Sequence, residues 1–290
     1  MQKKIKKAIV AVAGSGTRLL PATKSMPKEM LPIVDKPVIQ LVVEELVEAG
    51  IEDIILVTKW DKKPLEDHFD HSWALENELE KSGKIEQLEK VRRLSEMANF
   101  VYVRQKGPYG NGTPLLSAAS LVDDEPFVYV FGDDLVKTET SFTKQMVEDF
   151  KKDGHLMNGV EQMPEEVLHR YGIVKLKEGT NQIEDIVEKP APGEAPSNLA
   201  QFGRMIFNQD IITTLKETTP GKDGELWVTD AIRNYVRNGG VFVAKTITNG
   251  TWLTTGDPLN YINATLSYAM ERPELKEGIL LFMEKYREKK

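Results

Sequence analysis

A glycine-rich turn near the amino terminus has the composition of an anion-binding loop. Residues 13–18 read Ala-Gly-Ser-Gly-Thr-Arg and directly follow a short apolar run. Glycines let the backbone approach an anion closely, and successive N–H groups can surround phosphate oxygens, to which Arg18 adds a bidentate donor. The turn is not a Walker loop, because Gly-Lys-Ser/Thr is missing, nor a dinucleotide fingerprint, because residue 19 is leucine. Taken alone, the pattern is equally compatible with an ordinary tight turn.

Three cations lie close to this turn in the sequence. Arg18, Lys24 and Lys28 fall within eleven residues, in a chain whose formal net charge is −7. A solvated basic surface is the alternative interpretation. Because the cations accompany a glycine-rich turn after the first predicted strand, the pattern favours a triphosphate site.

Two acidic residues follow a strongly apolar segment, residues 127–131. The sequence continues Gly132-Asp133-Asp134. Ligands of open α/β sheets bind beyond the carboxyl ends of the strands, and carboxylates there suit Mg²⁺, which prefers oxygen ligands and substrate phosphates. The alternative is a turn whose aspartate caps a helix. We expect a metal site.

A second charged pair stands at the end of another predicted strand, in the sequence Val187-Glu188-Lys189-Pro190. Glu188 can accept hydrogen bonds from sugar hydroxyls, and Lys189 can bind a phosphate. Such a pair is more often an exposed surface feature, so the residues alone do not decide between these interpretations.

The hydrophobic pattern predicts the elements that must position these groups. Residues 8–13, 37–49 and 54–58 read as strand, helix and strand, which indicates a βαβ unit and a parallel sheet. Further predicted strands are 100–104, 127–131, 159–162, 171–176, 183–188 and 241–245, and predicted helices are 114–121, 141–152, 227–238, 258–270 and 275–286, with residues 61–98 mostly helical. Up to about residue 150 this alternation is that of a doubly wound α/β fold. We expect one domain over residues 1–290.

The composition excludes several classes of function. The 290 residues include no cysteine, so disulfides, thiolate catalysis and cysteine-based metal sites are excluded, which fits a cytoplasmic protein. The net charge of −7 argues against general nucleic-acid binding. Apolar runs have the length of core strands, far short of the roughly 20 residues of a membrane span. We expect neither a nucleic-acid nor a membrane partner.

Taken together, the motifs resemble those of the bacterial UTP–glucose-1-phosphate uridylyltransferases, within the sugar-phosphate nucleotidyltransferase family. The resemblance spans nearly the whole chain and keeps the order of the motifs. The matching segments are residues 14–24, 27–37, 51–54, 66–70, 103–106, 132–134, 171–174, 187–190, 194–200 and 229–231.

The resemblance implies a fold, a reaction and a site. The fold is a Rossmann-like, doubly wound mixed sheet with a nucleotide-binding core over about 1–150, an appended sugar-binding β region over about 151–260, and C-terminal helices over 258–290. The reaction joins UTP to glucose 1-phosphate with Mg²⁺, giving UDP-glucose and pyrophosphate by direct in-line attack. The implied residues are catalytic Arg18, Lys28 and Asp133; nucleotide-binding Ala13, Gly14, Gly16, Thr17, Gln105 and Gly110; sugar-phosphate-binding Gly172, Glu188, Lys189, Gly203 and Glu225; and metal-binding Asp133, with Asp257 as a candidate second ligand.

The sequence departs from the family pattern at four places in this implied site. Val12 stands where the family has alanine, and residues 107–114 read Gly-Pro-Tyr-Gly-Asn-Gly-Thr-Pro instead of Glu-Pro-Leu-Gly-Leu-Gly-His-Ala. Trp227 replaces a glutamine. Thr254 stands where related enzymes carry an aspartate that is a second metal ligand in some branches. Asp257 and Asp134 are the candidates to compensate for that carboxylate, and the alternative is Mg²⁺ held by Asp133 and phosphates alone.

These departures leave alternatives open. The same chemistry on another sugar 1-phosphate, such as galactose or an N-acetylhexosamine 1-phosphate, or with dTTP, would place the change in residues 107–114. A catalytically impaired, sugar-nucleotide-binding regulatory paralogue would follow from the loss of a carboxylate at residue 254. The family also implies a homodimer or homotetramer, with the helices of 61–98 and the C-terminal helix as candidate interfaces.

Overall fold

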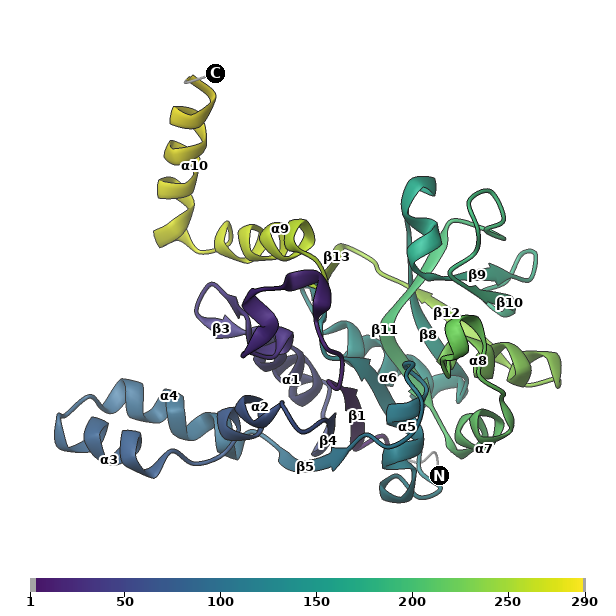
Figure 1. The fold of residues 1–290 in the computed structure, drawn as a ribbon, viewed down its shortest axis with the longest axis horizontal. Helices are drawn as coiled ribbons and strands as arrows, with labels where there is room; N and C mark the ends of the chain where they lie inside the picture. The colour runs from purple at the N-terminus through teal and green to yellow at the C-terminus, as the bar shows by residue number, and fades with distance from the viewer. Residues whose placement is uncertain (1–3, 289–290) are drawn as a thin grey trace.

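A mixed β-sheet forms the centre of the molecule (Figure 1) in the computed structural model, which describes residues 4–288. The strands of this sheet are β1 (Lys7–Ala11), β4 (Asp53–Thr58), β5 (Asn99–Arg104), β6 (Phe127–Phe131), β8 (Leu156–Gln162), β9 (Gly172–Leu176), β10 (Ile183–Glu188), β11 (Leu199–Phe207) and β12 (Phe242–Thr246). Their order is β10-β9-β11-β6-β1-β4-β5, with β8 pairing both β11 and β12.

One half of the sheet is parallel. Strand β1 pairs in parallel with β4 and β6, and β4 with β5. Parallel neighbours require a crossover, and α1 (Val38–Glu48) provides it between β1 and β4. Its apolar stripe, which includes Val38, Val42 and Leu46, is buried. The βαβ unit predicted from residues 8–58 is therefore confirmed, although the first strand ends at Ala11 instead of residue 13.

The other half of the sheet reverses direction at β11. This nine-residue strand runs antiparallel to β6, β8 and β9. The prediction of a doubly wound mixed sheet is confirmed. Strand β11 itself is absent from the sequence-based elements, as are two strands that form a separate ribbon, β7 (Asp134–Thr138) and β13 (Gly250–Thr254).

Helices cover the sheet and extend beyond it. Those not yet described are α2 (Lys63–His68), α3 (Trp73–Lys81), α4 (Ile85–Glu96), α5 (Thr113–Ala118), α6 (Phe142–Asp153), α7 (Gln209–Glu217), α8 (Val228–Arg237), α9 (Pro258–Ala269) and α10 (Pro273–Glu288). Figure 1 shows the α3–α4 pair and α10 projecting away from the body that contains the sheet. Within residues 4–288, no helix combines the length and apolar composition that crossing a membrane would require.

Short elements complete the region that follows β1. Three single turns of 3-10 helix, at Thr17–Leu19, Ala22–Lys24 and Lys28–Met30, carry the chain from β1 to the two-residue strands β2 (Pro32–Ile33) and β3 (Lys36–Pro37). Gly16, which precedes the first of these turns, has a φ of 64°. This left-handed conformation is one that glycine adopts without a steric penalty, so the turn itself favours glycine at residue 16.

Candidate active site

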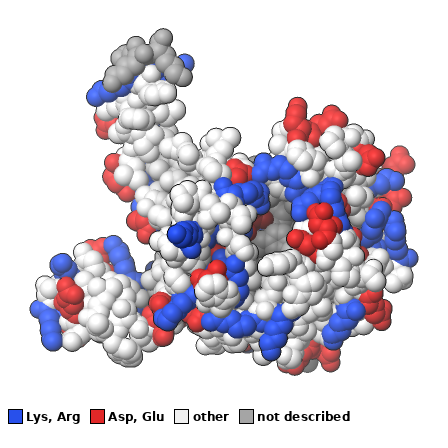
Figure 2. All heavy atoms as spheres, viewed as in Figure 1, with Lys and Arg blue, Asp and Glu red and all other residues white. Residues whose placement is uncertain are grey.

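A cavity of about 400 Å³ lies between the two halves of the sheet. The carboxyl ends of β1 and β6 contribute Ala11, Phe131 and Asp133, and β9 and β10 contribute Gly172 and Glu188 on the other side. Figure 2 shows a hollow in this face of the molecule, bordered by basic and acidic side chains. A cavity at the carboxyl ends of parallel strands is where the sheet topology places a ligand.

Most of the residues predicted from the sequence line this cavity. They are Ala13, Gly14, Arg18, Lys28, Gln105, Gly110, Asp133, Gly172, Glu188, Lys189 and Glu225. Gly16, Thr17, Gly203 and Asp257 are predicted site residues that do not line it, and neither does the predicted cation Lys24. Residues from positions 11 to 254 thus converge on one cavity, as the motifs indicate.

Lys28 and Asp133 are in direct contact on the wall of the cavity. The ammonium of Lys28 donates to Oδ2 of Asp133, and the two side chains retain 15% and 18% of their exposure. Burial opposes the charge on each group, but the attraction between them outweighs it. The pKa of Asp133 therefore lies below its usual value, and that of Lys28 lies above. Both groups are charged at neutral pH.

The backbone at Asp133 is fixed by the segment that follows β13. The carbonyl of Asp133 accepts hydrogen bonds from the backbone N–H of Thr255, at 2.9 Å, and from its hydroxyl, at 2.8 Å. Thr255 is 1% exposed. In the β7–β13 ribbon, Thr254 is directly opposite Asp134. The two segments that carry Asp133 and Thr254 are therefore held together at the cavity.

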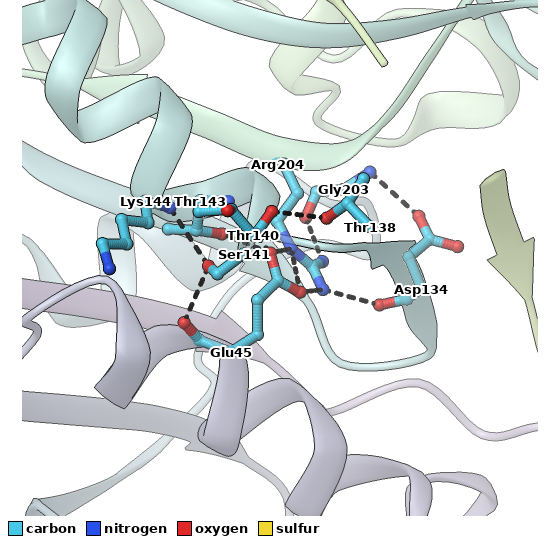
Figure 3. A network of polar contacts seen from close by, with 9 residues as sticks. All are labelled: Glu45, Asp134, Thr138, Thr140, Ser141, Thr143, Lys144, Gly203 and Arg204. Atoms are coloured by element: carbon cyan, nitrogen blue, oxygen red, sulfur yellow. Dashed lines mark hydrogen bonds and ion pairs between the residues drawn. The ribbon is translucent and has the colours of Figure 1, made fainter. Parts of the chain in front are cut away.

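A buried ion pair holds the other side of this turn (Figure 3). Arg204 of β11, which is fully buried, donates to both carboxylate oxygens of Glu45 of α1, the shortest contact being 2.6 Å. The same guanidinium donates to the carbonyl of Asp134 at 2.9 Å. The side chain of Asp134 accepts the backbone N–H of Gly203 at 2.9 Å. Arg204 therefore connects α1, β11 and the acidic turn.

The donor set suits a magnesium ion that is held largely by its substrate. No group of three acidic or histidine side chains placed to hold a metal occurs in residues 4–288. Asp133 offers one ionised carboxylate, and Thr254, which lines the same cavity, offers a neutral hydroxyl. Mg²⁺ commonly uses one or two carboxylates and completes its shell with water and phosphate oxygens.

Asp257, the candidate second metal ligand, is committed elsewhere. Its Oδ2 pairs with Arg170 at 2.6 Å, and its Oδ1 accepts the backbone N–H of Asn260 at 3.1 Å as the N-cap of α9. Its role in the structure is to begin a helix and to hold Arg170, which lines the cavity. The expectation that Asp257 compensates for Thr254 is therefore not supported by its position.

The loop that departs from the family pattern is connected to the start of α8. The backbone carbonyl of Tyr109 accepts a hydrogen bond from the backbone N–H of Leu226 at 2.9 Å. The backbone N–H of Gly112 donates to the carbonyl of Leu226 at 2.8 Å. The side chain of Asn111 accepts from the backbone N–H of Val228, also at 2.8 Å. Gly110 has a φ of 121°, and a Cβ there would lie 2.2 Å from the Leu226 carbonyl oxygen. We call this three-bond connection the 109–228 clip.

A chain of buried polar groups ends at Glu188. Asn158 donates to Gln201 at 2.8 Å, Gln201 donates to the hydroxyl of Thr229 at 2.6 Å, and this hydroxyl donates to Oε2 of Glu188 at 2.6 Å. Burial raises the pKa of Glu188, and the bond from Thr229 opposes that rise. The chain leaves Glu188 an acceptor on the cavity wall.

Two positions differ from the sequence-based expectation. Val12 does not lie beside the cavity: it is fully buried, and a Cβ on Gly132 would lie 2.4 Å from its Cγ1, so its branched side chain packs into the core while Ala11 and Ala13 line the cavity. Gly203 lies behind the wall instead of on it, because a Cβ there would meet Phe131 at 2.4 Å. Its backbone N–H supports Asp134.

Several cavity residues lie outside the motifs that were matched in the sequence. Arg170, Gln201 and Trp252 line the cavity. Arg170 precedes the matched segment 171–174 by one residue, and Gln201 directly follows the segment 194–200. Their position next to a matched motif in the sequence is therefore the signal that could have identified Arg170 and Gln201.

Comparison with known proteins agrees with the geometry. A model of the family described as Nucleotidyl transferase matches residues 7–271. A protein of Bacillus subtilis named UTP–glucose-1-phosphate uridylyltransferase is 47% identical over 285 residues, covering 97% of each chain. A solved UDP-glucose pyrophosphorylase complexed with UDP-glucose is 39% identical, with a TM-score of 0.83 over 92% of this chain and all of that one. A UTP-bound structure from Acinetobacter baumannii is 37% identical, with a TM-score of 0.87 over 96% of this chain and 98% of that one.

Proposed function

Because this chain belongs to the nucleotidyl transferase family, in the group of UTP–glucose-1-phosphate uridylyltransferases, we propose that it transfers a uridylyl group from UTP to glucose 1-phosphate. The products are UDP-glucose and pyrophosphate. The observation that carries the proposal is the contact between Lys28 and Asp133, which lies in one cavity with the residues assigned to the nucleotide and to the sugar phosphate.

The reaction needs positioning and charge neutralisation more than a protein nucleophile. A phosphate oxygen of glucose 1-phosphate attacks the α-phosphorus of UTP and forms the new P–O bond. The bond from the α-phosphorus to the bridging oxygen breaks on the opposite side, and pyrophosphate leaves with its electron pair. Lys28 and Arg18 provide fixed positive charge for the phosphates, which lowers the barrier where negative charge accumulates.

The nucleotide side is formed by the glycine-rich turn and by two residues after β5. The backbone of Ala13 and Gly14 contacts the nucleotide, and Gln105 pairs with the uracil edge beside Gly110. The backbone of Gln105 is fixed by a 2.8 Å hydrogen bond from its N–H to the carbonyl of Thr58, at the end of β4. This bond fixes the position of the Gln105 backbone, from which the side chain extends into the cavity.

The sugar side is formed by β9, β10 and the segment before α8. Gly172, Glu188 and Glu225 face the glucose, and Lys189 binds its phosphate. Glu188 accepts hydrogen bonds from sugar hydroxyls, because in the described part of the chain only its Oε2 receives a hydrogen bond, from the buried Thr229, and its Oε1 is 3.9 Å from the ammonium of Lys189.

We propose Mg²⁺ as the cofactor, held by Asp133 together with phosphate oxygens and water. An ionised carboxylate beside a triphosphate would be repelled unless a cation lies between them, and Asp133 is ionised at neutral pH. The bound ion would add positive charge at the reacting phosphates. Without the ion, Lys28 is the counter-charge to Asp133.

Assembly, domain organisation and cellular location are further parts of the proposal. The continuous sheet from β10 to β5 supports a single domain with a nucleotide-binding and a sugar-binding part. A homodimer or homotetramer is supported by exposed apolar side chains on three helices. They include Leu259, Phe282 and Met283 on α9 and α10, at 50–69% exposure, and Trp73 on α3, at 73%. Analytical ultracentrifugation would detect either assembly. The cysteine-free composition suits the cytoplasm.

The proposal is tested by measuring pyrophosphate release over a grid of nucleoside triphosphates and sugar 1-phosphates, with and without Mg²⁺. We expect one strong signal, with UTP, glucose 1-phosphate and Mg²⁺. A strong signal with dTTP or with another sugar would keep the mechanism and move the specificity to residues 107–114. No release from folded protein that still binds UDP-glucose would favour the regulatory paralogue, to which the neutral Thr254 also points.

A further inference from the structure

Trp227 lies in the cavity wall although it has no hydrogen-bonding role toward a substrate. It immediately precedes α8, is 7% exposed and lines the cavity. Its indole N–H is already used, because it donates to the carbonyl of Lys222 at 3.0 Å. The part of the side chain that remains available is therefore the face of the ring.

The ring face is occupied by the ammonium of Lys189. The Nζ atom of Lys189 is 3.9 Å from the centroid of the Trp227 ring. This separation is well inside the roughly 6 Å over which a cation is attracted to an aromatic face, and tryptophan is the strongest aromatic partner. The two residues come from different elements, the end of β10 and the start of α8, so the contact connects the two sides of the sugar-facing wall.

Lys222 closes a ring of contacts between these two residues. Its ammonium donates to the carbonyl of Lys189 at 2.7 Å, while its own carbonyl accepts the indole N–H of Trp227. The sequence of contacts is therefore Trp227 to Lys222, Lys222 to Lys189, and Lys189 back to Trp227. Removal of the indole breaks two of these three contacts.

The backbone of Lys189 needs such support. Its φ is 45°, in the left-handed region that non-glycine residues rarely adopt. Its N–H donates to the carbonyl of Tyr171 at 2.9 Å, and Pro190 follows. The ammonium is thus directed by a restricted backbone at one end and by the indole at the other.

The indole holds the ammonium without neutralising it. The Glu188 carboxylate is 3.9 Å from Nζ of Lys189, at the outer limit of an ion pair. A closer carboxylate would compete with an incoming phosphate, whereas the ring is neutral and leaves the N–H donors of the ammonium exposed on the other side. The side chain of Lys189 is 32% exposed, so a ligand in the cavity can reach it.

We propose that Trp227 is a positioning residue that orients Lys189 toward the phosphate attached to the sugar. The proposal rests on the proposed function, which assigns that phosphate to Lys189. Trp227 acts through Lys189 and does not bind the nucleotide. Its replacement therefore weakens binding of the sugar nucleotide while leaving the binding of UTP unchanged.

The test is calorimetric binding of UDP-glucose and of UTP, which requires no turnover. Trp227→Leu is expected to weaken UDP-glucose binding roughly tenfold, and Trp227→Phe, which keeps a ring face, by about two- to threefold. UTP affinity is expected to stay within twofold in both. Trp60→Leu serves as the matched control, because Trp60 is 85% exposed and does not line the cavity. Thermal unfolding midpoints identify any variant that fails to fold.

A double replacement separates positioning from simple contact. Lys189→Met keeps the aliphatic stem and removes the charge. If Trp227 acts through Lys189, then adding Trp227→Leu to Lys189→Met causes little further loss of UDP-glucose affinity. Additive losses, or equal effects of Leu and Phe at residue 227, would overturn the inference. Wild-type protein that binds UTP but not UDP-glucose would instead overturn the proposed function, and this inference with it.

Discussion

Replacing Thr229 with valine removes one hydroxyl from the middle of the buried polar chain that ends at Glu188. Valine has nearly the same shape, and residue 229 is fully buried, so packing is retained while two hydrogen bonds are lost. Gln201 Nε2 loses its acceptor, and Glu188 Oε2 loses a donor.

The structure gives the size of each loss. A buried amide left without a partner costs about 1–3 kcal/mol, so the free energy of unfolding of Thr229→Val is expected to fall by that amount. The bond to Glu188 is charge-assisted, and its loss leaves the carboxylate free to rotate and easier to protonate. We expect KM for glucose 1-phosphate to rise about tenfold, with KM for UTP unchanged.

Urea unfolding and steady-state kinetics with a pyrophosphate-coupled assay would measure both effects. Thr229→Ser keeps the hydroxyl and is expected to restore KM and most of the stability. Thr214→Val is a matched control, because the Thr214 hydroxyl only donates to the carbonyl of Asp210 within α7. If Thr229→Val left both KM for glucose 1-phosphate and the unfolding free energy unchanged, the polar chain would have no role in orienting Glu188.

Three further predictions concern the acidic turn, its buried support and pH. Asp133→Asn should lower kcat at least a hundredfold while UTP binding, measured by calorimetry without Mg²⁺, is retained; unchanged kcat would remove Asp133 from the metal site. Arg204→Met leaves the buried Glu45 carboxylate without its cation and should reduce the free energy of unfolding, measured in urea titrations, by about 3–5 kcal/mol. A change below about 1 kcal/mol would contradict the network of Figure 3. KM for glucose 1-phosphate should rise as pH falls through the raised pKa of Glu188, above the usual 4.5, and Glu188→Gln should abolish that limb of the profile. Since a raised carboxyl pKa favours the folded state as pH falls, this group does not itself cause acid unfolding. Circular dichroism would separate the limb from unfolding caused by carboxyls whose pKa is lowered, such as Asp185 and Asp257.

Strand β11 shows where reading the sequence fails. Its apolar run is interrupted by Gln201, Gly203 and Arg204, so neither alternation nor a continuous apolar segment is present. In the structure these residues are buried because each has a specific partner, and the partner of Arg204 is 159 residues away. Local pattern contains no information on such a pairing. Strands such as β6, which are buried on both faces by apolar residues, are predictable for the opposite reason.

The candidate site likewise contains residues that the sequence identifies and residues whose roles only the structure shows. Arg18, Lys28 and Asp133 could be identified because their residue types and positions after strands indicate phosphate and metal chemistry. The supporting roles could not be predicted, because they depend on which side chains meet. Thr229 is in a matched segment, yet only the structure shows that it connects Gln201 to Glu188. The sequence identifies Trp227 as a replacement for glutamine, and only the structure shows Lys189 against its ring.

The 109–228 clip has a thermodynamic consequence for the two substrates. Because Tyr109, Asn111 and Gly112 are hydrogen-bonded to Leu226 and to Val228 at the start of α8, the clip joins the loop that carries Gly110 to the segment that carries Glu225 and Trp227. A ligand that orders one segment lowers the entropy that the other ligand must still remove. Whatever factor bound UTP adds to the affinity for glucose 1-phosphate, bound glucose 1-phosphate must add to the affinity for UTP. If the clip transmits this ordering, its three hydrogen bonds predict heterotropic cooperativity between the two substrates within a single chain.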